Sequence, residues 1–176
     1  MKTQNINEKI KLALFSADVE VVKQAIEKIS IDGNSLYLPL LFDLLNTFPE
    51  HEIELEITNL LGTVKDKQSV NSFMRAIENE KYKRIRKTLI SACWQNGLDF
   101  SNFIPVFVDI IIHDEWEVAF ESFTVIDNLE YLPSPEIVSI SRQKIEAALP
   151  SAASQVNYFL TRIMEKLNGE DFQSLT

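Results

Sequence analysis

The chain has 176 residues, of which 45% are hydrophobic and 24% charged, and its formal net charge is −9. This composition is typical of a globular domain with a real core, and the lone Cys93 excludes an internal disulfide framework and a cysteine-based zinc site. The acidic balance argues against nucleic acid and anionic membranes as partners, and a polar N-terminus with only short apolar runs predicts neither a signal peptide nor a membrane span, so we expect a cytoplasmic protein.

Apolar residues recur at spacings of three and four along the whole chain, which indicates helices, and alternating strand patterns of useful length are absent. Gly33 and Gly97 interrupt this periodicity as turn glycines do, and Gly169 is placed as a helix C-cap. In chain order the sequence predicts ten helices, over residues 5–16, 18–30, 35–46, 50–64, 68–79, 81–95, 100–112, 115–129, 135–149 and 151–167. Short connections make neighbours antiparallel, in one domain over 1–168 with a flexible tail over 169–176.

An internal repeat runs through these helices. The segment that begins Leu38-Pro39 matches the one that begins Ile104-Pro105 position by position, and the two prolines lie 66 residues apart, which is two steps of 33. An intermediate copy has Asn71 in place of the proline, and a weaker fourth copy begins at Ile137. A proline in the first turn of a helix costs little, because that amide has no intrahelical partner. The sequence therefore predicts repeated helix pairs.

Helix pairs of this period, with the pattern Leu-Pro-x-Leu-x-x-Leu-Leu in the second helix, resemble the HEAT family of α-solenoids over roughly residues 18–149. The resemblance implies an all-α fold, a right-handed α-α superhelix of antiparallel helix pairs with capping helices at both ends. First helices would form the convex side and second helices the concave side. TPR-like or plain bundle packing would also accommodate the helix pairs.

The basic residues are concentrated in one heptapeptide, which holds five of the 17: Lys81, Lys83, Arg84, Arg86 and Lys87. One interpretation is an anion site for phosphate or an acidic partner. The other, which we favour, is pairing with acidic first helices on either side, around Glu50–Glu56 and Asp114–Glu121. Such exposed pairs contribute little to stability individually.

Six residues are candidates for a binding surface on the concave face: Tyr37, Asp43, Arg75, Trp94, Asp109 and Arg142. The four charged ones alternate in sign at one helical position of successive repeats, and they could either form ion pairs between repeats, which we favour, or recognise a peptide. Trp94 falls where other copies carry polar residues, so we expect it to be partly exposed, and tryptophan is enriched at binding hot spots. Tyr37 and Tyr131 are weaker candidates of the same kind. For Trp116 we favour packing on Lys83 as a cation–π contact.

Catalytic and metal-binding groupings are missing from the sequence. His51 and His113 lack ligand partners at helical spacing and are expected to be solvated, and Cys93 falls on an apolar stripe. We therefore predict no enzyme activity, no metal and no cofactor. The resemblance implies a scaffold that binds a protein or peptide on its concave face. The alternatives are an acidic inhibitor or immunity-type protein for a basic enzyme and, less favoured, a relative of the HEAT-like DNA glycosylases or bilin lyases.

Overall fold

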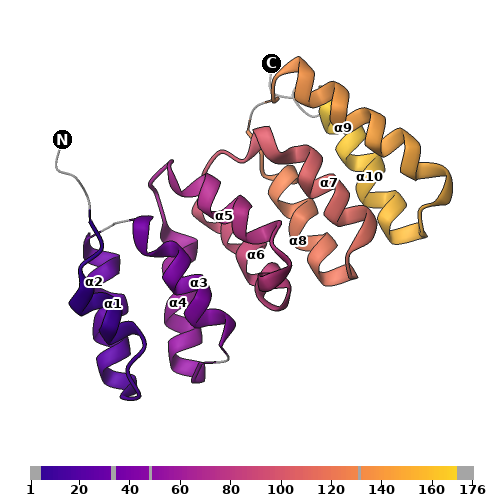
Figure 1. Ribbon diagram of the computed structural model, residues 1–176. Coiled ribbons are helices and arrows are strands. Elements are labelled where there is room, and N and C mark those ends of the chain that lie inside the picture. The colour runs from indigo at the N-terminus through magenta and orange to yellow at the C-terminus, as the bar shows by residue number, and fades with distance from the viewer. Residues whose placement is uncertain (1–4, 33–34, 48, 131, 170–176) are drawn as a thin grey trace. The chain divides into compact units, whose positions relative to one another are not determined.

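The computed structural model describes residues 5–32, 35–47, 49–130 and 132–169, in which every regular element is a helix and no strand occurs (Figure 1). All ten predicted helices are confirmed within these ranges: α1 (Glu8–Leu14), α2 (Val19–Asp32), α3 (Leu38–Asn46), α4 (His51–Thr63), α5 (Ser69–Ile77), α6 (Arg86–Asn96), α7 (Ile104–His113), α8 (Trp116–Asp127), α9 (Pro135–Ala148) and α10 (Ser154–Leu167). None of the described helices is long and apolar enough to cross a membrane.

The two matching proline segments have matching local structure. Pro39 and Pro105 are each the second residue of their helix, and a three-residue 3-10 turn precedes both helices, η1 (Ser35–Tyr37) before α3 and η3 (Ser101–Phe103) before α7. Two more 3-10 segments, η2 (Glu80–Ile85) and η4 (Leu149–Ser151), lead into α6 and follow α9. The sequence repeat is therefore a repeat of backbone conformation at these positions.

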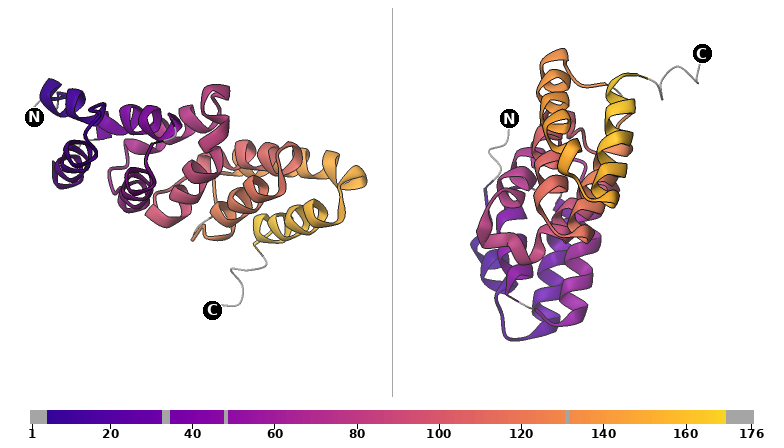
Figure 2. Two further views of the ribbon diagram at one scale, coloured as in Figure 1. Left: turned by 90° about the horizontal axis from the view of Figure 1, so that it is seen from below. Right: turned by 90° about the vertical axis from the view of Figure 1, so that its right-hand side faces the viewer.

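Contacts between residues divide the chain into two compact units, Met1–Leu98 (unit 1) and Asp99–Thr176 (unit 2). In unit 1, α1 packs on α3 and α3 on α5, while α2 packs on α4 and α4 on α6. The odd and even helices thus form two layers, which can be followed in Figure 2. The core lies between the layers and includes Leu41, Phe42, Ile57 and Phe73, with the Phe42 and Phe73 rings 5.4 Å apart.

Unit 2 repeats this arrangement with four helices. α7 packs on α9 and α8 on α10, and the consecutive pairs α7–α8 and α9–α10 are also in contact. Its core includes Phe107, Ile111, Ile126 and Leu160, all fully buried.

Gly97 interrupts the helical pattern and Gly169 ends a helix, as predicted, while Gly33, the other predicted turn glycine, lies outside the described residues. Gly97 follows α6 with φ +66°, and Gly169 follows α10 with φ +81°. Only glycine adopts this left-handed region without a steric penalty, so both positions terminate their helices cleanly.

Candidate protein-interaction surface

Tyr37 belongs to the core, so its prediction as an exposed binding residue is wrong. Its side chain is 2% exposed, and its hydroxyl oxygen accepts a hydrogen bond of 2.7 Å from the backbone N–H of Asn7, just before α1. The hydroxyl group is therefore hydrogen-bonded within unit 1. Tyr131, the similar candidate, lies outside the described residues.

Asp43, on α3, is bound within unit 1 by two side chains of η2. Lys81 Nζ lies 2.5 Å from its carboxylate, and the Tyr82 hydroxyl donates to the same oxygen at 2.6 Å. Partial burial opposes ionisation of the carboxyl group, but the hydrogen bonds from Lys81 and Tyr82 outweigh it and lower the pKa of Asp43. The pKa of Lys81 is raised by its hydrogen bond to Asp43.

Asp109, on α7, has the equivalent arrangement in unit 2. Lys144 Nζ on α9 donates to both carboxylate oxygens at 2.7 Å. These two residues and His113 edge a groove of about 510 Å³ whose remaining surface is mostly alanine. Asp109 and Lys144 therefore form an ion pair with each other at the edge of this groove.

The arginines of the predicted ladder do not pair with these aspartates. Arg75 is exposed on α5, and no ion pair or hydrogen bond joins it to any residue in the described ranges. Arg142 is half-buried and donates to the backbone oxygen of Leu167 at 2.8 Å, at the C-terminal end of α10. Ion pairs do connect α3 with η2 and α7 with α9, but the partners of the aspartates are lysines: Lys81 on η2, and Lys144, two residues beyond Arg142 on α9. The predicted pairing of aspartate with arginine is wrong.

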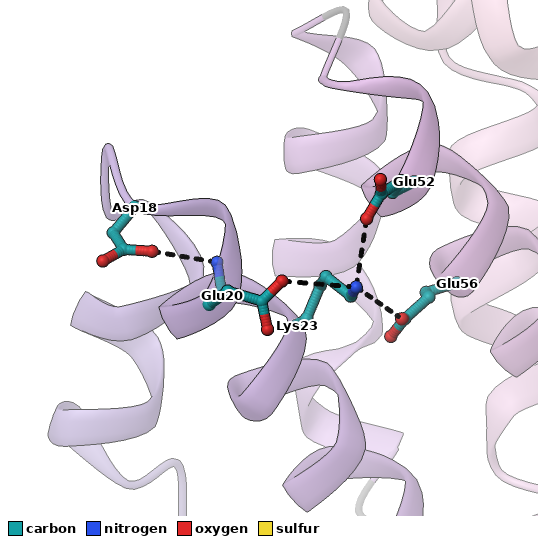
Figure 3. A network of polar contacts seen from close by, with 5 residues as sticks. All are labelled: Asp18, Glu20, Lys23, Glu52 and Glu56. Carbon is teal, nitrogen blue, oxygen red and sulfur yellow. Dashed lines mark hydrogen bonds and ion pairs between the residues drawn. The ribbon is translucent and has the colours of Figure 1, made fainter.

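The acidic residues of α4 pair with α2. Lys23 Nζ lies 3.0 Å from Glu52, 3.5 Å from Glu20 of its own helix and 3.9 Å from Glu56 (Figure 3). The hydrogen bond to Glu52 and the charge of Glu20 raise the pKa of Lys23. Ion pairs therefore link the neighbouring even helices α2 and α4, as expected. The partner of Glu52, however, is Lys23 and not a residue of the basic heptapeptide.

The basic heptapeptide makes its contacts with the layer of odd-numbered helices, α3 and α5. Lys81 binds Asp43, and Arg84 donates to the backbone oxygen of Leu45, also on α3. Arg86 is buried and donates to the backbone oxygen of Ile77 and to Glu80. The helix predicted over 81–95 begins as η2, whose kink at Tyr82 brings the start of the run to α3. Three of the five cations thus have structural partners.

Aromatic side chains of α8 and α10 form a continuous strip in unit 2. We define the aromatic strip as Trp116, Phe120, Phe123, Tyr158 and Phe159. The Trp116 and Phe120 rings stack at 5.5 Å with an interplanar angle of 16°, and Phe123 stacks on Phe159 at 4.7 Å. Phe120 and Tyr158 lie 6.2 Å and 6.1 Å from Phe159, which is buried. The strip is therefore anchored at Phe159.

Three rings of the aromatic strip face solvent. Trp116 is 48% exposed, Phe120 43% and Tyr158 60%. The flank formed by α8 is acidic, since this helix carries Glu117, Glu121 and Asp127 and no lysine or arginine. On α10 the nearest cation, Arg162, is paired with Glu165. The exposed rings therefore form an apolar surface next to a helix whose charged side chains are all acidic.

Sequence reasoning missed the aromatic strip, although a signal was present. The stripe of α8 that packs into unit 2 contains Ala119, Ser122, Val125 and Ile126, while Trp116, Phe120 and Phe123 form a second apolar stripe at spacings of four and three. One helix cannot bury two stripes in a single interface. Trp116 stacks on Phe120 of its own helix, and the predicted contact with Lys83, which would join the two units, stays a prediction.

The remaining predicted residues have simpler environments. Trp94, on α6, is 37% exposed, which confirms the expected partial exposure. His51 and His113 are exposed, as predicted. Cys93 is buried, its thiol donates to the backbone oxygen of Leu89 at 3.2 Å, and burial raises the pKa of the thiol well above its ordinary value.

A search for metal-binding clusters of histidine, cysteine, aspartate and glutamate finds no group of three or more within the ranges that the structure describes. The aromatic strip and the exposed charged side chains of the described residues suit contact with another macromolecule through apolar packing and charge.

Comparison with known proteins gives no assignment. No protein-family model matches the sequence, and no curated protein matches it.

Proposed function

We propose that this chain is a non-catalytic, HEAT-like helical-repeat scaffold that binds a protein or peptide partner, and that the aromatic strip on α8 and α10 is its binding surface. The alternating layers within each unit and the matching places of Pro39 and Pro105 support a right-handed superhelix of antiparallel helix pairs. The inner-face residues Asp43 and Asp109 are weaker candidates, because lysines already neutralise them.

The observation that carries this proposal is the exposure of three rings that contact other rings. Trp116, Phe120 and Tyr158 are all at least 43% exposed; Trp116 stacks on Phe120, while Phe120 and Tyr158 meet the buried Phe159 in tilted and edge-on contacts. Aromatic residues that are already immobilised lose little conformational entropy on binding, and tryptophan and tyrosine dominate interface hot spots. A partner that covered these rings would remove their apolar area from water without reordering the surface.

The acidic flank defines the chemistry of the partner. Glu117 lies on the helix that carries Trp116 and Phe120. A complementary surface would place lysine or arginine beside apolar side chains, for example on one amphipathic helix. The opposite charges of the two surfaces would speed association, and burial of the aromatic strip would supply most of the affinity. Because salt weakens only the first contribution, the affinity should fall only moderately as the salt concentration rises.

An acidic inhibitor of a basic enzyme is the second candidate, favoured by the net charge of −9. It differs in its salt dependence, because a complex held mainly by charge weakens steeply as ionic strength rises. Measuring affinity at low and high salt therefore distinguishes the two candidates once a partner is in hand.

The experiment compares two variants of the full chain as affinity baits. Trp116→Ala/Tyr158→Ala removes two exposed rings, and Leu55→Ala removes a single exposed apolar residue of α4 (52% exposed) as the matched control. Partners enriched by wild type are identified by quantitative mass spectrometry, purified and measured by calorimetry. Loss of one hot-spot residue costs more than about 1 kcal/mol, so the double variant should bind at least about tenfold more weakly.

The control variant should bind as wild type does. A direct partner whose affinity is unchanged by Trp116→Ala/Tyr158→Ala would refute the assignment of the aromatic strip as the binding surface.

A further inference from the structure

The N-terminal end of unit 1, formed by α1 and α2, exposes apolar side chains (Figure 1). α1 packs on α2 and α3, and α2 also packs on α4, so these contacts leave one side of the pair uncovered by the described residues. Leu12 of α1 is 73% exposed and Val21 of α2 is 38% exposed, while Phe15, which ends α1, is 49% exposed. Terminal helices that only cap a repeat stack keep a polar outer face, so this end has the character of a contact surface.

A groove of about 110 Å³ lies between the two helices. We define the N-terminal groove by its lining residues, which are Lys9, Ile10 and Ala13 of α1 and Val21, Gln24, Ala25 and Lys28 of α2. A cavity of about 150 Å³ encloses a molecule of benzene. The N-terminal groove is smaller, so it suits the side chains of a partner's surface better than a free ligand.

Two lysines give the N-terminal groove a positive charge. Lys9 and Lys28 are exposed, and no ion pair or side-chain hydrogen bond joins either of them to another residue in the described ranges. The other lysines of these helices are paired, since Lys11 lies 3.5 Å from Glu8 and Lys23 contacts the glutamates around it. The positive charge of the N-terminal groove is therefore available to a partner that is both apolar and acidic.

The aromatic strip has this complementary chemistry. Its three exposed rings are apolar, and the charged side chains of α8 are all acidic. Lys9 and Leu12, three residues apart on α1, place a cation beside an exposed apolar side chain, which is the partner chemistry proposed for the strip. We propose that the N-terminal groove of one copy of this chain binds the aromatic strip of a second copy. This inference rests on the proposed function, because it names a partner for the strip.

Such a contact joins two different surfaces and is therefore heterologous. Each copy in a pair keeps one free groove or one free strip, so association continues into chains or closed rings. The net charge of −9 makes two copies repel each other, and the two lysines of the groove supply the local attraction that a contact requires. We therefore expect reversible association that increases with protein concentration.

Sedimentation velocity of the full chain over a range of concentrations measures this association. The end variant, Leu12→Gln/Lys28→Gln, removes an exposed leucine and an exposed lysine of the N-terminal end. The strip variant is Trp116→Ala/Tyr158→Ala. Loss of one hot-spot residue costs more than about 1 kcal/mol, so each variant should raise the dissociation constant at least about tenfold.

The matched control for the end variant is Leu55→Gln/Lys87→Gln. It makes the same two kinds of substitution at exposed positions of α4 and α6, away from the N-terminal groove. This control should associate as wild type does.

A mixture of the end variant with the strip variant tests whether the two surfaces bind each other. The end variant keeps its strip and the strip variant keeps its groove, so an equimolar mixture should form one-to-one dimers with wild-type affinity and no larger assembly. A contact between two like surfaces would not be restored by mixing.

The proposal would be overturned by a wild-type chain that stays monomeric up to its solubility limit, by an end variant that associates as wild type does, or by a mixture that stays monomeric. If a variant fails to fold, dilution of ¹⁵N-labelled wild type remains decisive. Amide shifts should change both on α1 and α2 and on α8 and α10, and changes on one of these surfaces alone would contradict the proposal. The proposed function is judged separately, by the binding of a different protein to the strip variant, and it stands if self-association alone fails.

Discussion

Replacing Phe159 tests whether one buried ring supports the whole aromatic strip. This side chain is 6% exposed and lies between 4.7 and 6.2 Å from three other rings. Phe159→Ala removes its burial and leaves a cavity, which costs about 3–5 kcal/mol of unfolding free energy. Tyr158→Ala, one residue earlier on α10, removes a ring that is 60% exposed. It should cost only about 1 kcal/mol, under half of the value for full burial.

The two variants form a matched pair, because both introduce alanine into the same helix and any gain in helix propensity cancels between them. Urea unfolding followed by tryptophan fluorescence measures the cost. A Trp94→Phe background leaves Trp116 as the single tryptophan, so the signal reports on unit 2. The reasoning would be refuted if Phe159→Ala cost less than about 1.5 kcal/mol, or if Tyr158→Ala cost as much as Phe159→Ala.

Three further predictions concern unit 1. Because the pKa of Asp43 is lowered below 3.8, its contribution to stability is complete above that pH and is lost as the pH falls through the folded-state pKa. Asp43→Asn should therefore lower the urea midpoint at pH 7 more than at pH 3, and a difference that grows on acidification would contradict this. Gly97→Ala should cost about 1–2 kcal/mol in urea unfolding, since its left-handed φ of +66° is strained for alanine although nothing lies within 4 Å of the new methyl group. Lys23→Met should leave Glu52 and Glu56 without their shared cation, so the variant's midpoint should lie further below that of wild type at low salt than at high salt.

Local patterns predicted the helices well, because helix periodicity, turn glycines and first-turn prolines are all encoded within a few residues. The places of Pro39, Pro105 and Gly97 follow directly from such signals. The layering of odd and even helices within each unit agrees with the predicted helix pairs for the same reason: amphipathic stripes must cover each other.

Side-chain environments set by distant contacts could not be predicted from these patterns. The buried Tyr37 accepts a hydrogen bond from the backbone N–H of Asn7, 30 residues earlier. Asp43 forms an ion pair with Lys81, 38 residues later. A charge pattern shows which residues could attract one another, but the reach and direction of a lysine depend on the turn that carries it. Likewise the sequence places Phe120 and Tyr158 on helices without saying which apolar stripe the core leaves uncovered.

The burial of Cys93 has a practical consequence. Cys93 is a buried, protonated thiol on α6 and therefore a poor nucleophile toward maleimides and related reagents. The single cysteine should thus stay unlabelled in the native protein. Two cysteines introduced at exposed positions, one in unit 1 and one in unit 2, would therefore be the modifiable sites. Spin labels or a dye pair attached to them would report the distance between the two units in solution.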